Sequence, residues 1–526
     1  MTNKKTVDSN VVGLSYAEEA SFGVLPDLQG GTVGDQAGAI WYPLDPNEYS
    51  DFGAEITTVA RNPINQSRQR RKGVVTDLDA SGGFQQDLTQ SNLTRLMQGF
   101  FFADAHERMS NKPINGKAAN TAAVVSITGT GSVIEVGSGK GASFAVGMLL
   151  KTSGFANSAN NIDLMMITAI SGDDLTVDAT GMVDETYSVG ILEVVGFEFT
   201  DLQTTYSANT LTLTSATGFA GKGFQVGEWI FVGGDATSDR FALGASGENA
   251  PGYARIHKVE ANALTLKEPT WTPLTNDGSG KTIRVFTGKF LRNEKTPALI
   301  KQRSYQIERT LGEDENGTQS EVLLGSIPNE FSMNVESADK MVCDLSFVAT
   351  SNELRSGADG LKDGDRTNTI SVEDAYNTSS DVYQQRLFVY GDTPSPTSLF
   401  AYVMSATISI NNNAIGRKAI GTIGSFSISV GDFEVTGNLE VYFTTIAAVN
   451  AVRQNKDVGY NLILAARNVG IVYDIPLVSL GGGRVTVEKD EPIMLPLEQQ
   501  AAENEYGYTM SATYFSYLPL VAMASE

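Results

Sequence analysis

Short runs of alternating apolar and polar residues recur along most of the chain, separated by clusters of Gly, Asn, Asp and Ser. Examples are residues 54–61, 209–216, 262–268, 425–430 and 482–490. A period of two places successive side chains on opposite faces of a strand, and the intervening residue types favour turns. The pattern therefore predicts a mainly β chain with little helix.

Two segments have helical periodicity instead. Residues 91–102 follow this period after Ser91, a residue type that caps helix N-termini, and residues 445–454 form a second, shorter case. The apolar positions expected on the buried faces are Leu93, Leu96, Met97 and Phe100 in the first segment and Ile446, Val449 and Val452 in the second. We expect one short helix in each.

A tandem repeat lies in the first half of the chain. FAVGMLLKTSG (144–154) resembles FQVGEWIFVGG (224–234), and residues 166–178 resemble residues 256–268 with matching internal spacing. Repetition at a fixed interval indicates repeated structural units. We predict two tandem small β insert domains, residues 106–196 and 197–288.

A second duplication surrounds these inserts. DASGGFQQDLTQSNLTRLMQ (79–98) aligns without a gap to EVTGNLEVYFTTIAAVNAVR (434–453), and TTVARNPI (57–64) aligns to ISINNNAI (408–415). Both copies have the order strand, Asn-containing turn, basic loop, strand and helix, and SYQIERT (304–310) and YNLILAAR (460–467) follow as later strands.

The two duplications predict a domain order. A discontinuous β domain comprises residues 55–105 and 289–350, and its second copy comprises residues 401–526. Residues 351–400 form a linker, and residues 1–54 form an extended N-terminal arm. We expect the inserts to lie on the outside of any assembly and to be dispensable for its closure.

The composition of the chain excludes several classes of protein. The chain has 61 acidic and 38 basic residues, a net charge of −23, and such a surface does not attract duplex DNA or anionic lipid. One cysteine excludes an internal disulfide framework. No apolar run approaches 18 residues, and no apolar core follows the two N-terminal lysines, so we expect neither a membrane span nor a secretory signal.

The segments that resemble phosphate-binding or calcium-binding motifs lack residues that those motifs require. TNDGSGKT (275–282) and VGSGKGAS (136–143) lack the Gly or Ser/Thr positions of a phosphate loop, and the acidic loops 312–321 and 359–366 do not follow a calcium-loop pattern. We expect His106 and His257 to have surface or packing roles and Cys343 to be buried in a strand. We predict no catalytic, cofactor-binding or metal site.

One basic cluster stands out in this acidic chain. It consists of Arg61, Arg68, Arg70, Arg71 and Lys72. It either contacts acidic surface on a neighbouring copy of the chain or forms a solvated hairpin loop, and the two interpretations are equally supported. Binding of nucleic acid is less favoured because no aromatic residues are interleaved with the cations.

Residues 56–101, with their NPI turn, SRQRRKG loop and aspartate-rich strand, resemble the N-terminal part of major tail tube proteins of long-tailed bacteriophages. LSYAEEASFGVLP (14–26) does so too. The resemblance implies tail-tube-type β-sandwich domains whose sheets join those of neighbouring copies into a barrel, with no enzymatic activity. Stacked rings of such copies form the tube through which DNA passes into the host.

The resemblance also implies partners and location. An ordinary member has one domain and forms hexameric rings, so a chain with two such domains suggests a trimer with pseudo-sixfold symmetry, with a hexamer as the alternative. Other tail proteins would bind the tube ends, DNA would pass without specific binding, and the chain would be assembled in the bacterial host cytoplasm into the virion tail. The competing interpretations are a surface β-repeat adhesin and, less favoured, a carbohydrate-active enzyme built from β domains.

Overall fold

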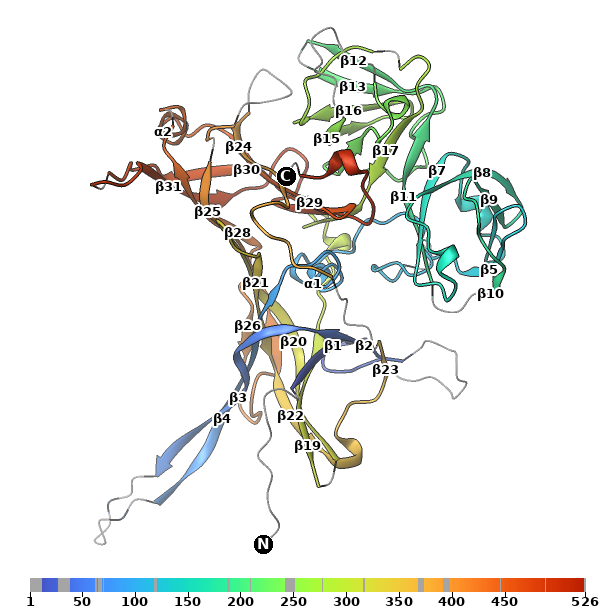
Figure 1. Cartoon of the computed structure of the whole chain (residues 1–526). Coiled ribbons are helices and arrows are strands. Elements are labelled where there is room, and N and C mark those ends of the chain that lie inside the picture. Colours follow the sequence, from blue (N-terminus) through green and yellow to red (C-terminus); the bar gives the residue numbers. More distant parts are fainter. Residues whose placement is uncertain are drawn as a thin grey trace. The chain divides into compact units, whose positions relative to one another are not determined.

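The fold is mainly β, and its two described α-helices are short. The computed structural model describes residues 12–26, 38–61, 64, 69, 71–117, 121–186, 190–208, 210–241, 251–276, 278–315, 317–367, 373–390, 398–400, 402–444, 446–487 and 489–524. The chain divides into two units (Figure 1). Unit 1 contains Met1–Phe102, Ile300–Tyr376 and Ser405–Asn438, and unit 2 contains Ala103–Leu299, Asn377–Met404 and Leu439–Glu526. No helix among the described residues is long and apolar enough to cross a membrane.

Unit 1 is organised around one long strand, β20. It contains all or part of β1 (Gly13–Glu18), β2 (Ile40–Leu44), β3 (Pro46–Arg61), β4 (Arg71–Asp87), β19 (Tyr305–Asp314), β20 (Gly317–Glu336), β21 (Val342–Ala349), β22 (Ser351–Ser356), β23 (Asp365–Arg366), β25 (Val403–Asn411), β26 (Ile415–Arg417), β27 (Ser427–Ser429) and β28 (Glu434–Tyr442). The first half of β20 pairs with β19 and β22, and the second half pairs with β21 and β25. Pro328 lies at the irregularity where the β21 ladder skips a residue, a position that tolerates the missing N–H of proline.

The core of unit 1 follows from strand alternation. In β21 every second side chain is buried, including Cys343 as predicted. Phe84 of β4, Phe347 of β21 and Phe331 of β20 pack with Phe100 in an aromatic cluster. The hydrophobic pattern of these strands therefore determines their inward faces.

The N-terminal residues take part in this sheet. Within the segment expected as an extended arm, β1 pairs with both β19 and β2. Tyr16 and Trp41 are buried, and the Trp41 indole N–H donates to the Asp363 carbonyl. Residues 351–400, expected as a linker, likewise include β22, β23 and β24 (Val382–Val389). Both stretches therefore contain paired strands, and the N-terminal stretch also buries apolar side chains.

Two β segments of unit 2 share one pattern of pairing. The thirteen described strands of this sheet are β5 (Val124–Thr128), β6 (Val133–Val136), β7 (Met148–Ser153), β8 (Met165–Ser171), β9 (Asp174–Val177), β10 (Glu185–Thr186), β11 (Ile191–Phe199), β12 (Gln203–Ser207), β13 (Thr210–Thr214), β14 (Trp229–Val232), β15 (Gly252–Val259), β16 (Ala263–Lys267) and β17 (Ile283–Thr287). From the central β11–β17 pair outward, the order is β7, β8, β9, β6, β5 on one side and β14, β15, β16, β13, β12 on the other. Apart from β10, which pairs with β5 at one edge, each strand therefore occupies the place of its counterpart six or seven strands away.

The C-terminal strands of unit 2 surround a second long strand, β30. They are β18 (Lys289–Arg292), β24, β29 (Val458–Ala466), β30 (Val469–Gly482), β31 (Met494–Ala501) and β32 (Ser511–Phe515). The first part of β30 pairs with β29 and β32, its end pairs with β31, and β24 pairs with the outer edge of β29. These pairings match those of β20 with β19, β22 and β21, and that of β1 with β19.

The β5–β17 sheet shares a core with these C-terminal strands. Leu149, Trp229, Phe231, Tyr253 and Phe286 pack against residues of β29, β30, β32 and the C-terminal segment. Because β29 and β32 are covered on both faces, every residue in them is buried. This shared core argues against the expectation that the inserts are dispensable, since their removal would expose an apolar sheet face to water.

The two predicted helices exist but are shorter than expected. The first is α1 (Met97–Phe100), and its predicted apolar positions are all buried. The Met97 N–H bonds to the carbonyl four residues back, whereas the Gln98 and Gly99 N–H groups bond to carbonyls three residues back, so the turn before α1 is not a regular α-helix. The predicted cap was wrong, because Ser91 bonds instead to the Glu373 carboxylate.

The second helix is α2 (Ala447–Arg453). Val449 is buried as predicted, together with Ala448 and Ala451, whereas Ile446 precedes the helix and is exposed. The strand predicted over residues 482–490 was also wrong. β30 ends at Gly482, where Gly482 and Gly483 have positive φ angles that an extended strand cannot continue through.

Candidate assembly surface

The two glycine-rich loops form turns whose described residues are held by contacts within the chain. Gly278 and Gly280 form a turn that leads directly into strand β17, as the sequence predicted. In the other loop, the backbone N–H groups of Gly139 and Gly141 donate to the Asp173 carboxylate at 2.9 Å each. These bonds lower the pKa of Asp173 below its usual value, and they occupy donors that an anion would need.

The two histidines, which were candidates for acid–base or metal chemistry, contact other side chains of the protein. His106 Nε2 lies 3.0 Å from the Glu294 carboxylate, and His257 Nδ1 lies 2.9 Å from the Tyr506 hydroxyl. Burial lowers the pKa of His257. Among the described residues there is no group of three or more His, Cys, Asp or Glu side chains placed to hold a metal ion.

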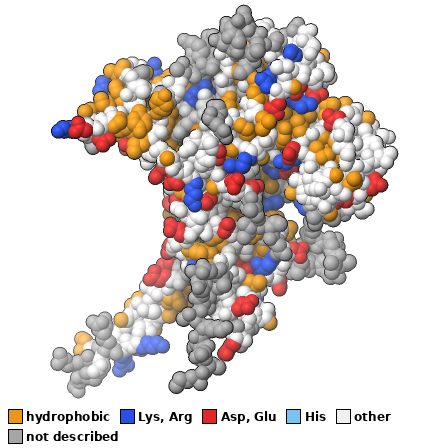
Figure 2. Space-filling view, in the orientation of Figure 1, with side chains coloured by type: hydrophobic (Ala, Val, Ile, Leu, Met, Phe, Trp, Pro, Cys, Tyr) orange, Lys and Arg blue, Asp and Glu red, His pale blue; other side chains and the backbone are white. Residues whose placement is uncertain are grey.

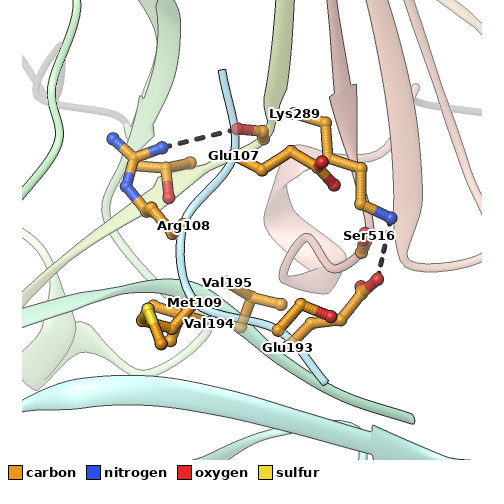
Figure 3. Close-up of a pocket in the computed structure, with 11 residues that line it drawn as sticks. Glu107, Arg108, Met109, Glu193, Val194, Val195, Lys289 and Ser516 are labelled. Carbon is orange, nitrogen blue, oxygen red and sulfur yellow. Dashed lines mark hydrogen bonds and ion pairs between the residues drawn. The ribbon is translucent and has the colours of Figure 1, made fainter. Parts of the chain in front are cut away.

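A small polar pocket lies in unit 2 (Figure 3). Its volume is about 20 Å³, which is room for about one water molecule. Lys289 donates to Glu193 at 2.7 Å, and the Glu107 carboxylate accepts the backbone N–H groups of Ile114 and Asn115. Burial raises the pKa of Glu107. The charges are satisfied within the protein, and the space is too small for a substrate.

A buried ion network joins the β5–β17 sheet to β30. Arg255 of β15 is fully buried and donates to Glu268 at 2.6 Å and to Asp474 of β30 at 3.0 Å. The Tyr390 hydroxyl lies 3.2 Å from the same guanidinium. Although burial opposes ionisation, the two carboxylates hold the pKa of Arg255 well above its usual value. This network fixes the first part of β30 against β15.

The hairpin of β3 and β4, called hairpin A (Pro46–Asp87), has apolar side chains exposed to solvent in unit 1. Beyond residue 54 its two strands extend from the rest of unit 1 as a two-stranded ribbon (Figure 1). Ile56 and Val59 of β3 are 56% and 53% exposed, and Val74 and Val75 of β4 are about half exposed. A two-stranded ribbon is marginally stable in water, and exposed apolar side chains on it indicate a contact surface.

The basic cluster lies at the free end of hairpin A. Arg61 pairs across the ribbon with Arg71, and both residues and Lys72 are exposed. Figure 2 shows Lys and Arg side chains gathered at this end. Arg68 and Arg70 lie outside the described residues. The cluster therefore sits where it could reach another molecule.

A second hairpin, hairpin B, runs from β25 to β28 and is seated in unit 1. Residues 405–411 of β25 pair with β20, and the Asn412 side chain donates to the carbonyls of Phe100 and Pro328 at 3.0 and 3.2 Å. Ala414 and Ile428 pack with Phe102 and Ile327. Hairpin B thus extends the sheet that contains β20.

The loop of hairpin B carries its own basic contact with hairpin A. The Lys418 ammonium pairs with Asp77 and Asp79, both on β4. The hydrogen bond from Lys418 lowers the pKa of Asp77, and the two carboxylates raise the pKa of Lys418. Sequence reasoning missed this contact, because Lys418 lies 341 residues from Asp77 and 339 residues from Asp79 in the chain.

A hairpin that exposes apolar side chains and a basic end is typical of a protein that contacts other molecules. A family model described as phage tail tube protein matches residues 9–501. The chain belongs to the phage tail tube protein family. No curated protein matches it. As a phage tail tube protein, it is a structural component of the virion tail, which agrees with the resemblance seen in residues 14–26 and 56–101.

Proposed function

We propose that this phage tail tube protein polymerises as stacked rings into the tail tube, the conduit for DNA into the host, and has no enzymatic role. The match of the family over residues 9–501 carries this proposal. The exposed apolar side chains of hairpin A support the proposal, because apolar surface left in water is unfavourable for a monomer and is typical of a contact surface. Other tail proteins would bind where the tube ends.

We further propose that the ring contains three chains. The long strands β20 and β30 have the same set of strand partners, which supports two copies of one tube domain in each chain. If each copy supplies one sector of the six-sector ring that the resemblance implies, three chains close it with pseudo-sixfold symmetry. A heterologous interface that closes on itself is the usual basis of such rings.

Electron microscopy of the purified chain tests both statements. Rings or tubes with a central hole are expected, and a reconstruction should show three copies of the chain per ring, with sixfold symmetry broken at side-chain detail. Particles that remain monomeric at all concentrations and salt conditions contradict the proposed function. Six copies per ring contradict only the trimer.

A further inference from the structure

The end of strand β30 has one unpaired edge. Residues 478–482 pair with β31 on one side, whereas β29 pairs with the other edge only as far as Val478. Among the described residues, no strand pairs with this second edge along residues 479–482. An open edge beside a paired strand is ready to accept another strand.

The corresponding edge of β20 is already occupied. An Ile-Pro pair lies beside a register irregularity in both long strands, at Ile327-Pro328 in β20 and at Ile475-Pro476 in β30. We use these pairs to align the residues of β20 with those of β30. Under that alignment, Ser332 corresponds to Leu480. Ser332 pairs with Ser409 of β25, and their hydroxyl oxygens lie 3.1 Å apart. In unit 1, therefore, hairpin B fills the edge that is open in β30.

Hairpin A has the form needed to fill the open edge. The alignment of residues 57–64 with residues 408–415 makes β3 the counterpart of β25. In β25 the inward residues Ile408 and Ile410 are buried, whereas Val59, the counterpart of Ile410, is half exposed. Among the described residues, β3 pairs with β4 on one edge and with no strand on the other along residues 54–61.

We propose that hairpin A of one copy docks on unit 2 of another copy, with the outer edge of β3 pairing antiparallel to residues 479–482 of β30. This inference rests on the proposed assembly into rings. Transferring the β20–β25 register places Val59 opposite Ser479 and Thr58 opposite Leu480. The partner is a second copy of this chain because, among the described residues, the equivalent edge of β20 is occupied by this chain's own equivalent hairpin.

Charge supports the same arrangement. In unit 1 the basic loop of hairpin B contacts Asp77 and Asp79 of hairpin A. The gap-free alignment of residues 79–98 with residues 434–453 extends upstream to place Asp432 and Glu434 at the equivalent positions of hairpin B, where both are exposed. The basic end of hairpin A would then meet Asp432 and Glu434 of the next copy, so that each hairpin contacts the following one around the ring.

Disulfide trapping between two single-cysteine proteins tests the register. Thr58→Cys and Leu480→Cys are purified separately, mixed, allowed to assemble and oxidised. The native Cys343 is fully buried and contributes no background. A covalent dimer should form with at least ten-fold higher yield than from Thr57→Cys mixed with Leu480→Cys, because a one-residue shift moves the side chain to the other face of the strand. Ser332→Cys with Ser409→Cys in one chain should form the equivalent bond within unit 1.

The outcomes separate this inference from the proposed function. Rings that form without a preferred Thr58–Leu480 bond, or that trap the Thr57 pair instead, overturn the docking register while leaving the tube function intact. Absence of rings and of covalent dimers overturns both. With both cysteines in one chain, the bonds should close around the ring, and the largest covalent species should contain as many chains as one ring.

Discussion

Hairpins A and B are counterparts in sequence but differ in their surroundings. The inward side chains of β25 are buried because β20 offers an open edge beside them, and Ile410 is 0% exposed. Val59 at the equivalent position of β3 is 53% exposed. The difference shows that local sequence is sufficient to form a hairpin, whereas burial of its apolar side chains requires an acceptor strand.

The two acceptor strands also differ. Ser326 of β20 is a buried neutral residue, whereas the aligned position of β30 is Asp474, which is bound by Arg255. The acceptor in unit 2 is thereby tied to the β5–β17 sheet, while the acceptor in unit 1 is not. The β5–β17 sheet therefore helps to hold β30, the strand to which hairpin A is proposed to bind.

Removing Arg255 should have the largest effect. Arg255→Met leaves Glu268 and Asp474 buried without their cation, and breaking such a pair costs about 3–5 kcal/mol. Urea denaturation should show this loss near neutral pH. Burial already raises the pKa of Glu268, so the penalty should shrink as the pH falls and Glu268 becomes protonated.

The matched control for this change is a triple variant. Arg255→Met combined with Glu268→Gln and Asp474→Ser removes Arg255 together with both of its carboxylate partners and should recover much of the stability, while the buried Arg386 beside the site keeps its charge. Equal losses in the single and triple variants at every pH would show that the network is not the cause.

A matched pair of apolar truncations tests the comparison of the hairpins directly. Ile410→Ala should destabilise the unassembled chain by about 2–5 kcal/mol, because it leaves a cavity in a buried site. Val59→Ala should change the stability of that chain by less than about 0.5 kcal/mol but should weaken ring formation. Denaturation and sedimentation measure the two effects. A large loss of monomer stability in Val59→Ala would mean that hairpin A is already seated within its own chain.

Charge reversal tests the basic end of hairpin A. Changing Arg68, Arg70, Arg71 and Lys72 to Glu should slow polymerisation at low salt, since each exposed ion pair contributes about 0.2–1 kcal/mol and the ring repeats it. Adding Asp432→Lys and Glu434→Lys should restore assembly. Light scattering at two salt concentrations measures the rates. Normal assembly of the first variant would show that the loop is merely solvated.

The smallest effect concerns Lys418. Its bond lowers the pKa of Asp77, so the contact stabilises hairpin B above the ordinary aspartate pKa and is lost as the pH falls through the lowered value. Lys418→Met should return the pKa of Asp77 toward its usual value, with little change in overall stability because the pair is exposed. Carboxyl NMR titration measures this shift. An unchanged pKa in the variant would show that Lys418 does not determine it.

Much of the fold could be predicted from hydrophobic periodicity. The alternation in residues 342–349 predicts a strand with one buried face, and the spacing of Leu93, Leu96, Met97 and Phe100 predicts a buried helical turn. Both depend on contacts between neighbours in the chain, so the local pattern carries the information. The end of β30 at Gly482 was not predictable in this way, because the apolar alternation continues past the turn.

The sequence by itself determined a mainly β chain, two short helices, the repeated elements and the family resemblance, because each depends on residue type and spacing. Only the tertiary structure decided which repeated elements found partners. The inward side chains of β25 in hairpin B are buried against β20, whereas residues 55–61 of hairpin A are exposed, although the two sequences align. Strand pairing joins residues far apart in the chain, and whether an edge is open depends on what folds beside it. For that reason the open edge of β30, Arg255 with Asp474, and the contact of Lys418 with Asp77 emerge from the structure alone.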